Sequence, residues 1–236
     1  RLRDEGLESF PLDLACPDSV AAAADEALRR CDGRLDGLFN NGAFAVPGAV
    51  EDLPRAAMRA IFEVNLFGQL DLTNRVLPAM RARGRGRVVM NSSVLGVVAA
   101  PWRGAYVATK FALEGLTDTL RLELAGTGID VCLIEPGPIA TAFRRNAIAH
   151  FEAHIDWRAS ARVAEYERVL LPRLYQPAAR KDRFELGPEA VVEKLIHALE
   201  SPRPAARYPV TLPAQAAGIM RRLFSARLLD RVLRGR

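Results

Sequence analysis

The sequence predicts an α/β fold built on a parallel sheet, and three observations lead to it. Short apolar runs alternate with longer runs of helical period along most of the 236 residues. Half of the residues are hydrophobic, so the chain can bury one sizeable core. Several apolar runs end in polar or glycine-containing turns. Strands that alternate with helices pair in parallel through right-handed crossovers, so we expect a doubly wound sheet with helices on both faces.

The first half of the chain is expected to hold two strands and two helices. Residues 7–14 fit a short strand, and an alanine-rich helix runs from Pro17 to about Cys31. Residues 35–39 fit a buried strand that enters Asn40-Asn41-Gly42-Ala43, a turn that a ligand could approach closely, although such a turn is often only a turn. A long helix is expected over 54–83. Asn65 in its middle marks a distortion or a site, because a buried amide needs partners.

The second half repeats the alternation. Strands are expected at 87–91, which leads into Ser92 and Ser93, at 129–134, which leads into the turn 136–141, and at 206–212. One helix carries Tyr106 and stops at Gly126-Thr127-Gly128, and another follows Pro188. Ligands collect at the carboxyl ends of parallel strands. We therefore expect Asn40, Ser93 and Pro136-Gly137 at one edge of the sheet.

Tyr106 and Lys110 are four residues apart on a predicted helix, so both side chains lie on one face. A free phenol has a pKa of about 10, and one cation at about 4 Å stabilises the phenolate by about 4 kcal/mol at an effective dielectric of 20. Lys110 alone could therefore make Tyr106 a usable acid and base near neutral pH, and a cationic nicotinamide would act in the same direction. The alternative is that both side chains only extend from apolar surface to water.

The net charge of +5 is a property of the C-terminal tail. Residues 214–236 hold six arginines and one aspartate, which is the whole excess. They predict a basic amphipathic helix that either lies on an anionic membrane or packs on its own domain or a second subunit, and packing is favoured. Residues 81–87 are arginine-rich but lack interleaved aromatic residues, so we expect no nucleic-acid partner. Three cysteines and three histidines at no metal spacing predict reduced thiols, a cytoplasmic location and no metal site.

The motifs, taken in order, resemble those of short-chain dehydrogenases/reductases over residues 1–212. They are Asp13-Leu14, Asn40-Asn41-Gly42-Ala43, Asn65, Ser93 thirteen residues before Tyr106, Lys110, and Pro136-Gly137 with Thr141. The resemblance implies a Rossmann-like domain at 1–213 with a substrate lid at about 142–186, and the amphipathic helix beyond it. It also implies that NAD or NADP is the cofactor, with NADP slightly favoured.

The resemblance assigns a role to each matched residue. Tyr106 would be the general acid and base, Ser93 would hydrogen-bond the substrate oxygen, and Lys110 would lower the pKa of Tyr106 and hold the nicotinamide ribose. Asn65 would position a water that links Lys110 to solvent. The remaining cofactor contacts would come from Asp13, Leu14, Asn40, Asn41, Gly42, Pro136, Gly137, Ile139 and Thr141.

The resemblance is strongest to retinol and 17β-hydroxysteroid dehydrogenases, which implies an apolar alcohol or carbonyl substrate (steroid, retinoid or lipid) and a dimeric or tetrameric homo-oligomer. Val97, Val98, Ala99 and Trp102 could add to an apolar pocket near Ser93, and the apolar residues of 142–186 could face a ligand or only pack in the core. The alternative function is a catalytically silent nucleotide-sensing or scaffold protein on the same fold.

The sequence departs from the family pattern in two places. The first turn has the order N-N-G-A in place of N-N-A-G, which keeps small residues at both positions. No glycine-rich turn follows a first strand, and such a turn holds the cofactor pyrophosphate at a helix N-terminus. We therefore expect an N-terminally truncated chain that lacks one strand-helix-strand unit of about 30 residues, with an uncovered sheet edge and weak cofactor binding.

Overall fold

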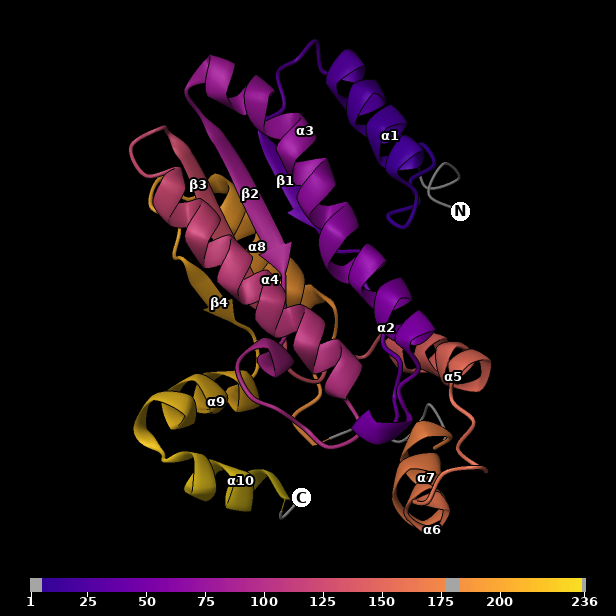
Figure 1. Cartoon of the computed structure of the whole chain (residues 1–236). Helices are drawn as coiled ribbons and strands as arrows, with labels where there is room; N and C mark the ends of the chain where they lie inside the picture. Colours follow the sequence, from indigo (N-terminus) through magenta and orange to yellow (C-terminus); the bar gives the residue numbers. More distant parts are fainter. Residues whose placement is uncertain (1–5, 177–182, 235–236) are drawn as a thin grey trace.

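A four-stranded parallel sheet lies at the centre of the part of the chain that the structure, a computed structural model, describes: residues 6–176 and 183–234 (Figure 1). Its strands lie side by side in the order β1-β2-β3-β4. Their bounds are Gly37–Asn40 for β1, Gly86–Asn91 for β2, Ile129–Glu135 for β3 and Arg207–Pro209 for β4. All three pairings are parallel, which confirms the predicted α/β fold. The carboxyl ends of the strands therefore meet at one edge.

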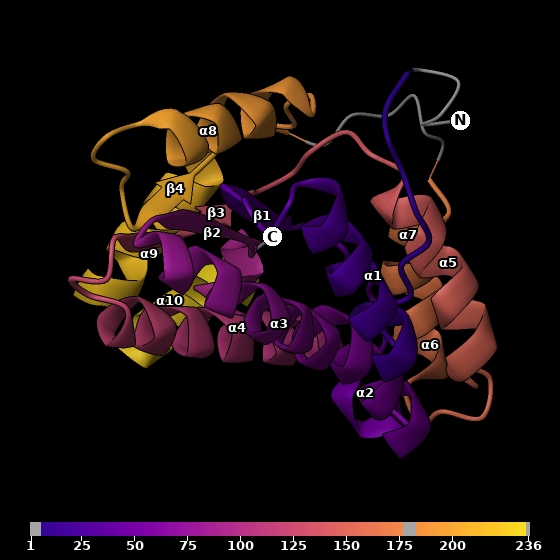
Figure 2. The same ribbon diagram turned by 90° about the horizontal axis from the view of Figure 1, so that it is seen from above.

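Helices cover both faces of this sheet (Figure 2). On one face lie α3 and α4, with α1 beside α3, and on the other face lies α8. Their bounds are Pro17–Arg30 for α1, Gly68–Arg83 for α3, Gly104–Glu123 for α4 and Glu189–Glu200 for α8. Successive strand residues alternate between the two layers: Val88 and Met90 pack under α3 and α4, whereas Val89 packs under α8. This double burial explains the continuous apolar runs of β2 and β3.

The long helix expected over 54–83 is present, but its backbone changes form around Asn65. Helix α2 (Arg55–Phe62) passes into a π-helical turn at Glu63–Phe67 and then into α3. The Asn65 side chain accepts a hydrogen bond from the Phe44 N–H at 3.0 Å and donates one to the Phe44 carbonyl at 2.9 Å. It also donates to Thr109 Oγ1 at 3.2 Å. The amide thus finds its partners through the distortion, and it ties the segment after β1 to α4.

Residues 7–14, expected to form a strand, do not form one. Within the described residues no strand lies beside this segment to pair with it, and β1 is the edge of the sheet. Leu14, at the end of this segment, packs closely on Gly68 of α3 and on Gly42: a Cβ on Gly68 would lie 2.1 Å from the Leu14 carbonyl oxygen, and one on Gly42 would lie 2.6 Å from Leu14 Cδ1. The two glycines therefore allow this close approach.

The C-terminal tail contains two helices where one was expected. The strand expected at 206–212 is limited to β4, and α9 (Leu212–Leu223) begins directly after it. Phe224 has an extended backbone (ψ 141°) that ends α9, and α10 spans Ala226–Arg234. The domain boundary at residue 213 stays a prediction.

The tail packs on the segment that follows β2. Ala217 of α9 and Leu229 of α10 are buried against Val98, and Val94 and Val97 pack against the same cluster. This segment includes the 3₁₀ turn η3 (Val94–Gly96). None of the helices in the described ranges combines the length and hydropathy that a membrane span requires.

The segment between β3 and α8 is mostly helical and packs around one tyrosine. Its helices are α5 (Phe143–His154), α6 (Val163–Glu165), the π-helical turn η4 (Tyr166–Leu170) and α7 (Leu171–Leu174). Tyr166 is fully buried, donates to Asp52 Oδ2 at 2.8 Å and accepts from the Ala49 N–H at 2.9 Å. Phe151, Ile155, Leu170 and Leu174 pack into the same core. Core packing therefore accounts for most of the apolar residues in this segment.

Replacing Gly128 with alanine is expected to lower the free energy of unfolding by about 2–3 kcal/mol. Gly128 has a φ of 79°, and a Cβ there would lie 1.9 Å from the Gly84 carbonyl oxygen, so both conformation and space oppose a side chain. Gly126 is the matched control, because it has the same φ of 79° but no heavy atom within 4 Å of its Cβ position. Gly126→Ala is expected to cost about 1 kcal/mol. Urea unfolding of both variants checks this, and equal losses would contradict the clash at Gly128.

Candidate functional site

A cavity of about 670 Å³ lies at the carboxyl ends of the strands, where the parallel sheet predicts a ligand. Eight residues predicted for the site line it: Asn41, Ser93, Tyr106, Lys110, Pro136, Gly137, Ile139 and Thr141. The rest of the lining is largely apolar. Its side chains come from the strand ends, η3, α5 and α8, and include Phe39, Val94, Leu95, Phe143, Val191, Val192 and Leu195. Polar and apolar side chains thus line the same cavity.

Ser93 and Tyr106 contribute two hydroxyl-bearing side chains to the cavity lining. Ser93 follows β2 with an extended backbone, accepts a hydrogen bond from the Leu95 N–H at 3.1 Å and donates to the Pro136 carbonyl at 3.4 Å. Tyr106 lies in the first turn of α4, and its ring meets the Phe143 ring edge-on with the centroids 5.3 Å apart. Both residues are 8% exposed, so the hydroxyls are shielded from bulk water.

Burial controls the acidity of Tyr106. Desolvation disfavours the phenolate and raises the pKa of Tyr106 to about 12, and a hydrogen bond with Ser93 acts in the opposite direction. The prediction that Lys110 alone brings the pKa of Tyr106 near neutral is therefore wrong, because desolvation of the phenol outweighs the effect of the surrounding protein groups. At neutral pH Tyr106 is protonated, which is the form that can donate a proton.

Lys110 is buried beside Tyr106 with its charge directed at a strand end. Only 1% of its surface is exposed, and its Nζ donates to the Asn91 carbonyl at 2.6 Å. The Nζ lies 5.6 Å from the centroid of the Tyr106 ring. Burial lowers the pKa of Lys110 to about 8, and the charge of Glu114 acts against this shift. Lys110 is therefore mostly protonated at pH 7, next to the tyrosine as the spacing of four predicted.

The buried Lys110 is expected to make the protein more stable as pH rises above about 8. Its pKa falls from an ordinary 10.5 to about 8 on folding, so between these values the folded chain has released a proton that the unfolded chain still holds. Between these values the free energy of unfolding rises by up to about 1.4 kcal/mol per pH unit because of this group. Below pH 8 the buried ammonium lowers the free energy of unfolding by its full amount.

Urea unfolding at about pH 7.5 and about pH 9 measures this gain, and Lys110→Met should lose it. Lys194→Met, on α8 and outside the cavity lining, is the control and should keep the gain. Burial raises the pKa of Cys132 to about 11, which opposes the gain above pH 9, so the difference between variants is the quantity to read. Identical pH dependence in Lys110→Met and Lys194→Met would contradict the assignment.

Four residues expected to contact a cofactor do not line the cavity: Asp13, Leu14, Asn40 and Gly42. Asn40 is 3% exposed and donates through its amide to Thr73 Oγ1 at 2.9 Å, so it is part of the core, and its neighbour Asn41 faces the cavity instead. Gly42 lies under Leu14. The Asp13 carboxylate accepts from the Ala15 N–H at 2.9 Å in a local turn.

Asn65 also lies outside the cavity lining, and its amide is engaged with Phe44 and Thr109. Thr109 in turn donates to the Tyr106 carbonyl at 2.8 Å. Asn65 therefore contacts the helix that carries Tyr106 and Lys110, and Thr109 lies between Asn65 and the cavity residue Tyr106. Its role toward a water stays a prediction.

The residues present fit the nicotinamide end of a nicotinamide nucleotide. Asn41, Lys110 and Thr141 supply amide, ammonium and hydroxyl groups to the same cavity, and Ile139 and the Pro136-Gly137 turn form its wall. At Gly137 a Cβ would lie 2.0 Å from Thr211 Oγ1, so the turn is fixed against the start of α9. For the pyrophosphate, no glycine-rich strand-to-helix turn occurs in the described ranges.

Several cavity residues were not predicted from the sequence. Arg103 lines the cavity directly before α4, and Asn91 lines it at the end of β2, where its Nδ2 donates to Asn41 Oδ1 at 2.6 Å. An arginine three residues before the tyrosine was a visible signal for Arg103. In contrast, Val97, Val98, Ala99 and Trp102 do not line the cavity. Val97 and Val98 pack against α9 and α10, and Trp102 packs edge-on to Tyr166.

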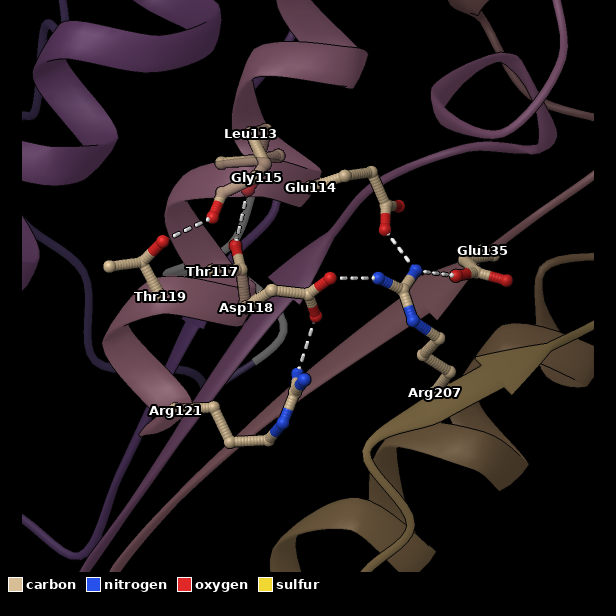
Figure 3. A network of polar contacts seen from close by, with 9 residues as sticks. All are labelled: Leu113, Glu114, Gly115, Thr117, Asp118, Thr119, Arg121, Glu135 and Arg207. Atoms are coloured by element: carbon tan, nitrogen blue, oxygen red, sulfur yellow. Dashed lines mark hydrogen bonds and ion pairs between the residues drawn. The ribbon is translucent and has the colours of Figure 1, made fainter. Parts of the chain in front are cut away.

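A network of charged side chains on α4, β3 and β4 was also missed (Figure 3). Arg207 of β4 donates to Glu114 and Asp118 of α4 and to Glu135 at the end of β3. Glu114 and Glu135 are 6% and 5% exposed. The signal for Glu114 was its position four residues after Lys110, which places it on the same helix face.

Comparisons with known proteins show the family of the chain. The sequence model of the family described as short chain dehydrogenase matches residues 2–151. The uncharacterized oxidoreductase YbbO of Escherichia coli K12 is 42% identical over 235 residues, which are 100% of this chain and 80% of YbbO. A crystal structure of a short-chain dehydrogenase from Streptomyces avermitilis superposes with a TM-score of 0.74 at 29% identity, covering 97% of this chain and 80% of that one.

Two human enzymes with named substrates are also similar. Retinol dehydrogenase 8 is 34% identical over 198 residues, covering 83% of this chain and 61% of that enzyme. The 17-beta-hydroxysteroid dehydrogenase type 1 is 34% identical over 207 residues, covering 87% of this chain and 60% of that enzyme. The chain therefore spans about three fifths of these two enzymes. The segment matched by the family model contains Ser93, Tyr106 and Lys110.

Proposed function

Because the chain belongs to the short-chain dehydrogenase/reductase family and is thus an NAD(P)-dependent oxidoreductase, we propose that it interconverts an apolar alcohol and the corresponding carbonyl. The observation that carries this proposal is that Ser93, Tyr106 and Lys110 line the same cavity, with the Lys110 Nζ 5.6 Å from the centroid of the Tyr106 ring. A hydroxyl pair beside a buried cation suits a reaction in which a carbonyl oxygen gains and loses a proton.

Tyr106 is the proposed proton donor and acceptor. In reduction its hydroxyl gives a proton to the carbonyl oxygen, and in oxidation the phenolate takes the proton back from the alcohol. Since burial raises the pKa of Tyr106 to about 12, the donating form is the resident one at neutral pH. The nicotinamide ring, when bound, supplies or accepts the hydride.

Ser93 and Lys110 act on the charge that this proton transfer creates. The Ser93 hydroxyl donates a hydrogen bond to the substrate oxygen, where negative charge develops as the hydride arrives. The Lys110 ammonium, 5.6 Å from the Tyr106 ring centroid, stabilises the phenolate left after donation. Lys110 and Asn41 would also hold the ribose of the nicotinamide half.

The proposed substrate is an apolar molecule of the steroid, retinoid or lipid class. Val94, Leu95, Phe143 and the α8 residues Val191 and Val192 supply apolar side chains to the cavity lining. Among similar proteins, the two human enzymes are named for retinol and for 17-beta-hydroxysteroids. We propose residues 142–186 as the lid over the cavity, because Phe143 and Asn146 of α5 line it. A homo-oligomeric state and the choice of NAD or NADP, with NADP slightly favoured, stay predictions.

A reductase screen tests the proposal. Oxidation of NADH and of NADPH is followed by absorbance with retinal, a 17-ketosteroid, a medium-chain aliphatic aldehyde and, as a small hydrophilic carbonyl, glyceraldehyde. Direct binding of both nucleotides is measured by fluorescence titration. We expect weak nucleotide binding and turnover that is higher with retinal or the ketosteroid. Preference for small hydrophilic carbonyls would overturn the apolar substrate class, and tight nucleotide binding would contradict the expected weak binding.

A further inference from the structure

Glu114 is a buried acid next to the buried lysine of the site. It follows Lys110 by four residues on α4, so the two side chains lie on the same face one turn apart. Lys110 is 1% exposed and Glu114 is 6% exposed. A buried charge without a counter-charge is strongly disfavoured, so each group depends on its charged neighbours for its ionisation.

The charges around Glu114 balance only when Lys110 is protonated. Arg207 donates to Glu114 and to Glu135 at 2.5 Å, and these two carboxylates are the buried acids of the network (Figure 3). One guanidinium therefore faces two carboxylates, and the Lys110 ammonium supplies the second positive charge. Neutral Lys110 would leave one buried negative charge in excess.

Asp118 belongs to the outer part of the same network. It accepts from Arg207 at 2.6 Å and from Arg121 at 2.7 Å, and its side chain is 38% exposed. Arg121 compensates the charge of Asp118, and Asp118 is two turns from Lys110 on α4. Asp118 therefore contacts the same arginine as Glu114 without standing next to the lysine.

The acidities of the two buried groups agree with this arrangement. Burial lowers the pKa of Lys110, and the Glu114 charge raises it. Burial raises the pKa of Glu114, and Glu135 acts in the same direction, whereas the Ser92 hydroxyl and Arg207 lower it. These groups, together with Asp118, are the charged and titratable neighbours that α4, β3 and β4 present to Glu114.

We propose that Glu114 is a positioning residue that acts through Lys110: its carboxylate, held by Arg207, keeps the buried ammonium beside Tyr106 charged, while the Asn91 carbonyl accepts its hydrogen bond. The catalytic consequence rests on the proposed function, since it assumes that Lys110 serves Tyr106 and the cofactor. The charge state of Lys110 does not rest on it. The test therefore reads the lysine directly, without substrate or cofactor, and its failure is distinguishable from failure of the oxidoreductase proposal.

The test is a pH titration of Lys110 by NMR. The chain contains three lysines, at positions 110, 181 and 194, so protein labelled with [¹³Cε]lysine gives three signals. Lys181→Arg and Lys194→Arg assign them. The titration midpoint of Lys110 is then compared in the wild type, Glu114→Gln, Glu114→Asp and the control Asp118→Asn, with circular dichroism to verify folding.

We expect Glu114→Gln to move the Lys110 midpoint to lower pH by about one pH unit, because an adjacent negative charge is lost. Glu114→Asp keeps the charge and should restore the midpoint to within about half a unit. Asp118→Asn should leave it unchanged. An unchanged midpoint in folded Glu114→Gln, or an equal shift in Asp118→Asn, would overturn the proposal.

The wild type alone also gives a decisive result if Glu114→Gln does not fold. The proposal requires that Lys110 titrates near pH 8 despite its burial. A wild-type midpoint near pH 5–6, the range of buried lysines without a counter-charge, would show that Glu114 does not support the ammonium and would overturn the proposal.

Discussion

Tyr106→Phe is expected to lower the turnover of carbonyl reduction by about 10²–10⁴-fold, because it removes the proton donor and leaves the ring in place. The ring is 8% exposed and packs edge-on to Phe143, so phenylalanine fills the same space and the fold should be retained. Substrate and nucleotide binding should change little. Initial rates at equal nucleotide concentration, with the best substrate of the screen, measure the effect.

Tyr208→Phe is the matched control for this experiment. Its hydroxyl is also buried, but it contacts His197 Nδ1 and the Ala205 N–H, and it does not line the cavity. The control is expected to keep its turnover. If Tyr106→Phe were as active as the wild type, Tyr106 would not be the proton donor, and the proposed mechanism would fail with it.

Arg207→Met is expected to lower the free energy of unfolding by about 3–5 kcal/mol at neutral pH, since it leaves two buried carboxylates without their guanidinium. Glu114 and Glu135 are 6% and 5% exposed, so water cannot replace the lost partner. Burial already raises the pKa of Glu114, and loss of Arg207 raises it further. The cost is therefore fully present at neutral pH and shrinks as pH falls through the raised pKa of Glu114 towards its ordinary value of about 4.5, because the Glu114 carboxyl then takes up a proton.

Urea unfolding at about pH 7.5 and about pH 4.5 measures this cost. Arg121→Met is the control, because it removes an arginine from the exposed end of the network, where Arg121 contacts only Asp118 among the labelled acids of Figure 3. A half-exposed ion pair contributes about 0–1 kcal/mol, so the control should change stability little. Equal losses in the two variants, or a loss in Arg207→Met that does not depend on pH, would contradict the role assigned to Arg207.

Local patterns in the sequence predicted most of the sheet and several polar residues that line the cavity, such as Ser93, Tyr106 and Lys110. The strand expected at 87–91 is β2, the strand expected at 129–134 is β3, and the helix that carries Tyr106 is α4. The two strands are continuous apolar runs and the helix has a strict helical period, so the packing of these elements follows from their sequence patterns. A spacing of four also placed Lys110 next to Tyr106, because helix geometry alone determines it.

The expectations that failed depend on contacts between distant parts of the chain. Residues 7–14 have the composition of a strand, but a strand needs a neighbour to pair with, and Leu14 packs on Gly42 and Gly68 instead. Asn40 points into the core because Thr73 offers its amide a partner from α3. The acidity of Tyr106 depends on how completely neighbouring elements bury the phenol, which spacing along one helix does not reveal.

The connectivity of the sheet has a consequence for the order of folding. Gly37 pairs with Arg87, Gly86 with Ile129 and Leu133 with Arg207, so every pairing joins residues at least 43 positions apart. Each such pairing closes a long loop, and the entropy lost on closure opposes the pairing until the contacts between the strands have formed. This slows folding. Helices such as α4 can form early, but the edge where the strand ends meet forms only when the strands pair. A partly folded chain would therefore hold Tyr106 and Lys110 on one helix without yet having a place for a ligand.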